Sequence, residues 1–204
     1  MVMSGQLSLP INGITGFATV GADPALQIVF NLSSVQFAVG TSGFSAAMNF
    51  PNSASYAAVF DQWRLDKVVC QVLFSSNNSA VNTNNQFPIV YGVTDVNDNT
   101  TLTSVDNALA YGNCRILQMG TSSGPTNGIQ LMTLPNPTVE EDALTTAGTL
   151  LTALGRKSPW INCANPSVQH NGYKFFVQTP GGTNAVLGYI TLIFRCFYSF
   201  KNII

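Results

Sequence analysis

The chain has 204 residues and carries eight Lys and Arg against nine Asp and Glu, a formal net charge of −1. Charged residues are 8% of the chain, far below the roughly 25% of an average soluble protein, which argues against a monomer kept dispersed by charge repulsion. Two kinds of protein fit this composition: a secreted module with a carbohydrate-like polar surface, or a subunit buried largely against copies of itself. We favour the second. The four widely spaced cysteines match neither a zinc nor a redox motif.

The first 23 residues are apolar but show no sustained period. Pro10, Gly13, Gly16 and Gly21 interrupt them repeatedly. We therefore predict an extended N-terminal arm over residues 1–23, lying on the domain or on a neighbouring copy. Residues 24–204 are enough for one large domain.

Alternation of apolar and polar residues predicts strands over residues 26–37, 64–74 and 87–95. Between the first two, Tyr56, Val59, Phe60 and Trp63 recur at helical spacing. We therefore expect a short helix over residues 54–62 with Ser53 as its N-cap. One or two helical turns, capped at Thr103 or Ser104, are expected over 104–110, and shorter strands over 114–119 and 129–134.

The segment after Pro137 changes character. Thr138 and Glu141 have the spacing of a capping box, and leucines and alanines then recur at helical spacing. This pattern predicts a helix over residues 138–154.

The long apolar stretch over residues 185–201 predicts the strand around which the fold is organised, preceded by a strand over 172–178. Even-numbered residues from Val186 to Phe200 form an uncharged face, which we expect in one core with the 68–74 strand. Odd-numbered residues form a mixed face that carries Arg195 and Lys201. About eight strands with helices in their connections indicate an all-β antiparallel sandwich.

Four motifs, in order along the chain, resemble the single jelly-roll capsid (coat) proteins of small icosahedral viruses. The resemblance is to the capsid proteins of viruses with circular single-stranded DNA genomes or of tombusvirus-like RNA viruses. FDQWRLDKVV at 60–69 is similar to the entry into strand C, and PIVYGVTD at 88–95 to strand D. SPWI at 158–161 with HNGYK at 170–174 is similar to the entry into strand H, and LGYI at 187–190 to strand I.

The resemblance implies an eight-stranded jelly roll with two four-stranded sheets, B-I-D-G and C-H-E-F, and short helices in the loops. It also implies a viral capsid protein of the virion, without enzymatic activity, which self-assembles inside the host cell into an icosahedral shell around nucleic acid. The sequence departs from the family at its start, since no Lys or Arg precedes Arg64. Eight cations cannot neutralise a packaged genome.

Two pairs of residues are candidate binding sites, one for a metal ion and one for nucleic acid. Asp95 and Asp98 offer oxygens for Ca²⁺ at a subunit interface, as in some related capsids, although turn formation alone also explains them. Arg195 and Lys201 share their strand face with Tyr189 and Phe197, and this mixture suits single-stranded nucleic acid or the rim of a subunit contact.

The alternative function is a secreted jelly-roll carbohydrate-binding (lectin-like) module. Exposed aromatics on one face and calcium-dependent sugar binding by a monomer would distinguish it from a capsid subunit. An enzyme is the third reading. His170 is the only histidine and has no nameable triad partners, and the acids at 140–142 are explained by helix capping.

Overall fold

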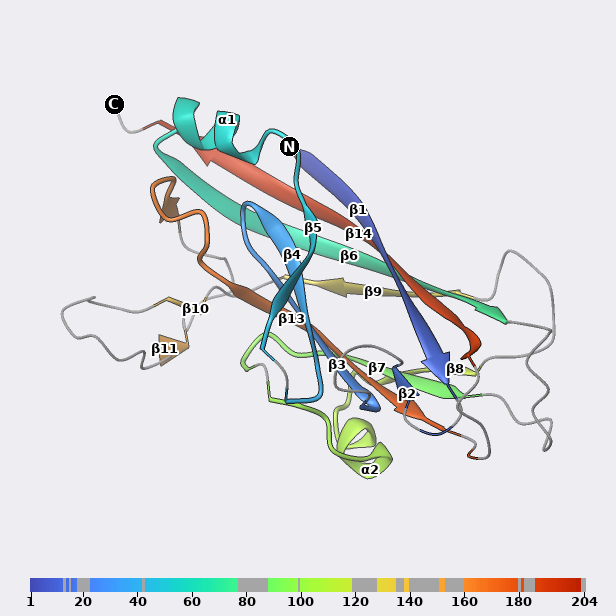
Figure 1. Ribbon diagram of the computed structural model, residues 1–204. Coiled ribbons are helices and arrows are strands. Elements are labelled where there is room, and N and C mark those ends of the chain that lie inside the picture. Colours follow the sequence, from blue (N-terminus) through green and yellow to red (C-terminus); the bar gives the residue numbers. More distant parts are fainter. Residues whose placement is uncertain are drawn as a thin grey trace.

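The structure is a computed structural model. It describes residues 1–12, 14, 16–17, 23–41, 43–76, 88–98, 100–118, 128–134, 138–139, 151–152, 160–179, 181 and 186–202. Two antiparallel sheets face each other across one core (Figure 1).

The first sheet has the order β12-β6-β14-β1-β2, and β9 also pairs with β6. Its longest members are β14 and β6, which pair along almost their whole length. The bounds are β1 (Val2–Asn12), β2 (Gly16–Phe17), β6 (Gln62–Ser76), β9 (Gly128–Thr133), β12 (Ile161–Asn162) and β14 (Val186–Lys201).

The second sheet has the order β5-β4-β3-β13-β7-β8. Its bounds are β3 (Ala25–Phe30), β4 (Ser34–Val39), β5 (Ser45–Asn49), β7 (Ile89–Thr94), β8 (Arg115–Gln118) and β13 (His170–Gln178). Two helices lie in the connections, α1 (Ser53–Val59) before β6 and α2 (Val105–Leu109) between β7 and β8.

The pairing is that of a jelly roll. The path β1-β14-β6-β9 has the B-I-D-G order, and the path β3-β13-β7-β8 has the C-H-E-F order. Strands β4 and β5 extend the second sheet beyond strand C. The predicted fold class is confirmed, but two strand letters are wrong: residues 60–69 lead into strand D rather than C, and residues 88–95 hold strand E rather than D.

The start of the chain corrects the sequence analysis. Val2–Asn12, expected in an arm, is strand β1, whose residues 2–12 pair with 197–186 of β14. Leu7, Leu9 and Ile11 are buried in the core. Gly5 hides the alternation of this strand in the sequence, because it stands at an inward position, where a Cβ would collide with the side chain of Met48.

The central core confirms the predicted face of the last strand. Ile190, Leu192, Phe194, Cys196 and Tyr198 pack in one cluster with the inward residues of β6. These β6 residues are Val68, Cys70 and Val72, with Phe74 packed against the cluster.

Two buried tyrosine hydroxyls tie the sheets together. Tyr173 of β13 donates to the backbone carbonyl of Val68, 2.9 Å away, and lies 3.3 Å from that of Leu131, both in the opposite sheet. Tyr198 of β14 donates to the carbonyl of Asn31 at 2.7 Å. Each hydroxyl therefore satisfies its hydrogen bonding inside the core.

Residues 26–37, predicted as one strand, are the hairpin β3–β4. The side-chain oxygen of Asn31 accepts from the backbone N–H groups of Ser33 and Ser34 at 2.9 and 2.7 Å. This turn is the kind that asparagine favours, because its side chain imitates the backbone acceptor.

Both short helices were predicted, with differences at their ends. For α1 the N-cap is Asn52, with φ of 66°, and not Ser53. Tyr56 and Phe60 pack on Phe200 as helical spacing predicts, whereas Val59 points outward and is 66% exposed. For α2, Ser104 is the N-cap of the two residues predicted, since its hydroxyl accepts from the backbone N–H of Asn107.

The helix predicted over residues 138–154 is wrong at its ends. Thr138–Val139 is strand β10 and Leu151–Thr152 is strand β11, and the two pair antiparallel. Residues 140–150 and 153–154 lie outside the described residues. Within the described part of the chain, no helix is long and apolar enough to cross a membrane.

The outer face of the C-H-E-F sheet is covered by its own chain. Tyr91, Val93 and Phe176 form a second buried cluster with Leu102 and Ala108, which come from the loop after β7 and from α2. Figure 1 shows α2 lying against this sheet. The two sheets therefore differ: the outer side of one is packed, whereas that of the other carries the exposed residues described next.

Candidate nucleic-acid interface and acidic loop

A β-bulge in β6 sets the chemistry of the outer face of the B-I-D-G sheet. The register shifts between Phe197 and Tyr198 of β14, which pair with Lys67 and Leu65, so Asp66 is the extra residue. Leu65 and Val68 on either side are fully buried. The bulge therefore turns two consecutive residues, Asp66 and Lys67, outward together.

Four of the six described Lys and Arg gather on this face, which we call the basic face. Arg195 and Lys201 are exposed on β14, as predicted from parity. Arg64 and Lys67 join them from β6, where they pair with Ser199 and Phe197. The other two described cations, Arg115 and Lys174, belong to the second sheet.

Aromatic rings hold three of these cations. The Lys67 ammonium lies 4.6 Å from the ring centroid of Phe197. The Arg64 guanidinium and the Lys201 ammonium each lie 4.6 Å from the centroid of Trp160. Cation–π contacts at such distances contribute about 0.5–1 kcal/mol each at exposed sites, so the charges are held against the sheet rather than extended into solvent.

Asp66 is the acid placed within the basic face. Its carboxylate accepts from Arg64 Nε at 2.7 Å and from the Ser199 hydroxyl at 2.5 Å. Because this pair is partly exposed, its contribution to stability is modest. Asp66 does, however, neutralise one of the four cations, so the face carries a net charge of about +3.

The basic face is also partly apolar. Val69 of β6 lies between Arg195 and Met132 of β9, and Met132 is 61% exposed. Tyr189 is 43% exposed on β14. Exposed apolar and aromatic groups beside cations offer contacts to unstacked bases as well as to phosphates.

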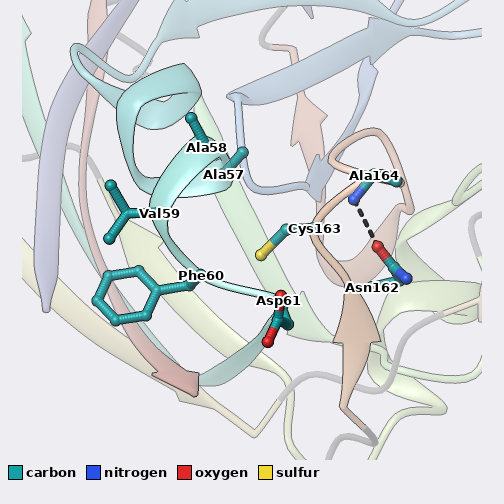
Figure 2. A pocket seen from close by; sticks show the side chains of 8 residues that line it. All are labelled: Ala57, Ala58, Val59, Phe60, Asp61, Asn162, Cys163 and Ala164. Carbon is teal, nitrogen blue, oxygen red and sulfur yellow. Dashed lines mark hydrogen bonds between the residues drawn. The ribbon is translucent and has the colours of Figure 1, made fainter. Parts of the chain in front are cut away.

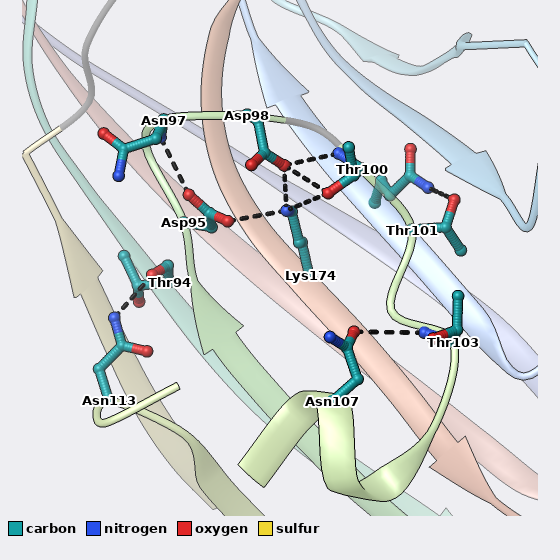
Figure 3. A network of polar contacts seen from close by, with 11 residues as sticks. Thr94, Asp95, Asn97, Asp98, Thr100, Thr101, Thr103, Asn107, Asn113 and Lys174 are labelled. Atoms are coloured by element: carbon teal, nitrogen blue, oxygen red, sulfur yellow. Dashed lines mark hydrogen bonds and ion pairs between the residues drawn. The ribbon is translucent and has the colours of Figure 1, made fainter. Parts of the chain in front are cut away.

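Asp95 and Asp98, the predicted calcium ligands, both form ion pairs with a lysine. Lys174 of β13, only 2% exposed, places its ammonium 2.7 Å from Asp95 Oδ2 and 2.5 Å from Asp98 Oδ1 (Figure 3). Asp95 is buried, whereas the Asp98 side chain is 50% exposed. Burial tends to raise the pKa of the Asp98 carboxyl, but hydrogen bonds from Lys174 and Thr100 outweigh it, so the pKa is lowered.

A calcium ion does not fit between these two carboxylates, because the Lys174 ammonium already lies there. A divalent ion bound by the same oxygens would stand within about 4 Å of a buried positive charge, a strongly unfavourable contact. Among the described residues, no group of three or more His, Cys, Asp or Glu is placed to hold a metal.

A pocket of about 560 Å³ opens beside the end of α1 (Figure 2). Asp61 supplies one carboxylate, and burial together with that carboxylate raises the pKa of the Cys163 thiol. A thiol with a raised pKa is a poor nucleophile, and one carboxylate does not make an acid/base pair. The lining residues are Ala57, Ala58, Val59, Phe60, Asp61, Asn162, Cys163 and Ala164.

Sequence reasoning missed three features of these sites: Trp160, the bulge in β6 and the role of Lys174. Trp160 lies in a loop, and its contact with Arg64 depends on the bulge. The bulge leaves no mark in the composition of β6. Lys174 did leave a signal, since it is the one charged residue in the otherwise uncharged strand His170–Gln178, and a buried lysine requires acidic partners.

No family model matches the sequence, and no curated protein matches it. Solved structures do match. One is the crystal structure of the 60-mer BFDV capsid protein, 16% identical, with a TM-score of 0.56 over 99% of this chain and 92% of that one. Another is the decameric BFDV capsid protein, 13% identical, with a TM-score of 0.53 over 99% and 98%. At these identities the likeness establishes the jelly-roll fold.

Proposed function

We propose that this chain is a viral capsid protein, a structural subunit without enzymatic activity that self-assembles into an icosahedral shell. The observation that carries the proposal is the B-I-D-G and C-H-E-F strand order, together with a likeness to an assembling capsid protein over almost the full length of both chains. On this proposal the protein resides in the virion and assembles inside the host cell.

The composition supports the same function. Only 8% of the residues are charged, and the cores of protein interfaces are depleted in charge. Exposed apolar side chains remain on several elements, among them Val59, Leu109 and Ile116, each about half exposed or more. Contacts between copies would cover such residues.

The first test is to express the chain and image it by negative-stain electron microscopy, with absorbance at 260 and 280 nm on the same fraction. Closed particles of uniform size are expected. A protein that stays monomeric at every salt and calcium concentration, and binds carbohydrate, would instead establish the lectin-like alternative.

We further propose that the basic face contacts packaged nucleic acid and lines the inner side of the shell. Four cations, two of them exposed, are interleaved with Phe197 and Trp160, and Tyr189 is exposed farther along the same face of β14. Such a surface suits single strands, in which bases stack on aromatic rings while cations contact phosphates.

This second proposal is tested by binding of a labelled oligothymidylate at several salt concentrations. For four phosphate contacts the slope of log K against log salt is about −3, from roughly −0.7 per contact on a single strand. Replacing both Arg195 and Lys201 by Gln is expected to reduce the magnitude of the slope by about 1.4.

The matched control is Arg115→Gln, which removes one exposed cation from the opposite sheet. Its slope is expected to equal that of the wild type. A loss in the control half as large as that in the double variant, one charge against two, would show that net charge alone governs binding, and would remove the basic face from the proposal.

A further inference from the structure

The Lys174 ammonium has a complete set of partners. Its three donors match three oxygens: Asp95 Oδ2 at 2.7 Å, Asp98 Oδ1 at 2.5 Å and Thr100 Oγ1 at 3.3 Å. The ring of Tyr111 lies 5.7 Å from the ammonium and covers it further. A lysine on a strand is thereby surrounded by the loop that follows the neighbouring strand.

The described residues of this loop, 95–98 and 100–104, are folded around this charge. Asp95 Oδ1 accepts from the backbone N–H of Asn97 at 3.0 Å. Asp98 Oδ1 also accepts from the backbone N–H and the hydroxyl of Thr100, at 2.8 and 2.6 Å (Figure 3). The carboxylates thus join the ammonium to the loop backbone, and the loop conformation depends on both.

The loop also contacts the rest of the second sheet. The hydroxyl of Thr101 donates to the carbonyl of Gly40 at 3.1 Å and is bonded to the buried side chain of Gln27. Leu102 is buried in the second cluster. Fixing the loop therefore fixes the outer surface of the C-H-E-F sheet, including the start of α2.

We propose that Lys174 is a built-in counter-ion that takes the place of a divalent cation at this loop. One positive charge, covalently part of β13, brings the two carboxylates together within a single subunit. The surface formed by the loop and α2 is consequently ordered before any contact with another copy, and its order is independent of calcium. This inference concerns the isolated subunit and does not rest on shell assembly.

The test compares thermal unfolding of the full chain in EDTA and in calcium chloride, for the wild type and for Lys174→Met. The wild-type midpoint is expected to be the same in both solutions. The variant leaves Asp95 buried without its partner, so its midpoint falls by about 10 °C in EDTA. Calcium is expected to raise the midpoint of the variant, since the oxygens that surround the ammonium in the wild type are then open to the ion.

Asp98→Asn is the second variant. Asp98 is half exposed, so the loss of its charge is better tolerated, and this variant keeps the test decisive if Lys174→Met does not fold. We expect its midpoint in EDTA to equal its midpoint in calcium chloride, as it does for the wild type. Asp106→Asn, which removes a carboxylate from α2, is the matched control and is expected to behave as the wild type.

A wild-type midpoint that rises with calcium, and loses this response in Asp98→Asn, would overturn the inference. So would a Lys174→Met variant that is as stable as the wild type, or one whose midpoint calcium does not raise. Particle formation is scored separately by microscopy, so failure to assemble does not bear on this result.

Discussion

His170 makes the stability of the fold depend on pH. It is fully buried at the start of β13, and its ring lies 5.3 Å from that of Trp63 in the opposite sheet. Its Nδ1 is 3.3 Å from the carbonyl oxygen of Val168. Burial lowers the pKa of His170 from 6.5 to about 4, although backbone hydrogen bonds offset part of this effect.

The direction of the pH dependence follows from these two pKa values. The unfolded chain takes up a proton near pH 6.5, whereas the folded chain resists doing so until the pH is about 4. The neutral imidazole therefore contributes its full stability above pH 6.5, and this contribution is lost as the pH falls toward 4. The loss is about 2 kcal/mol by pH 5 and about 3 kcal/mol when complete.

The assay is urea unfolding of the wild type and of His170→Gln at intervals from pH 7 to pH 4. Gln does not titrate, so the difference between the two free energies of unfolding isolates the histidine from the carboxylates. We expect the wild type to lose about 3 kcal/mol more than the variant over this range.

Parallel curves for the two proteins would refute the argument. If His170→Gln does not fold, NMR titration of the wild-type imidazole decides the matter instead. A ring that takes up its proton above pH 6 in the folded protein would contradict its burial between the sheets.

Two predictions concern packing between the sheets. Tyr173→Phe removes the hydroxyl that donates to the opposite sheet, and we expect a loss of about 1 kcal/mol in the free energy of unfolding, measured in urea; no loss would show that the hydroxyl is replaceable by water. At Gly188 a Cβ would collide with the carbonyl oxygen of Ser75, so Gly188→Ala is expected to cost about 1–3 kcal/mol. Gly112→Ala, where nothing lies within 4 Å of the added Cβ, is the control, and equal stability of both variants would disprove the close approach.

Much of the fold was predictable, because period-two patterns depend on local sequence. The two faces of β14 were assigned correctly by parity alone. Local residue preferences narrowed the cap of α2 to Thr103 or Ser104, and Ser104 is the cap. The errors arose where a local pattern is ambiguous. Gly5 interrupts the alternation of β1, and the capping-box spacing at Thr138 occurs at a residue that pairs in a strand.

The candidate sites were predicted less well, because they depend on residues distant in sequence. The exposure of Arg195 and Lys201 follows from parity, as does the outward position of Lys67, but Arg64 reaches the same face only through the bulge. Asp95 and Asp98 were recognised as a pair of oxygen donors. Their cation lies 76 to 79 residues away, and no spacing rule connects them.

The pairing of the first strand with the last has a consequence for biosynthesis. The backbone groups of Met1 and Tyr198, 197 residues apart, are hydrogen bonded at the edge of β14, and β14 also supplies the partner for β6. β1 and β6 have earlier partners in β2 and β9, but neither has β14 beside it until residues 186–201 have left the ribosome. Completion of this sheet therefore waits for β14, which predicts slow formation of the native state, and nascent chains without β14 lack the finished surface through which copies would associate.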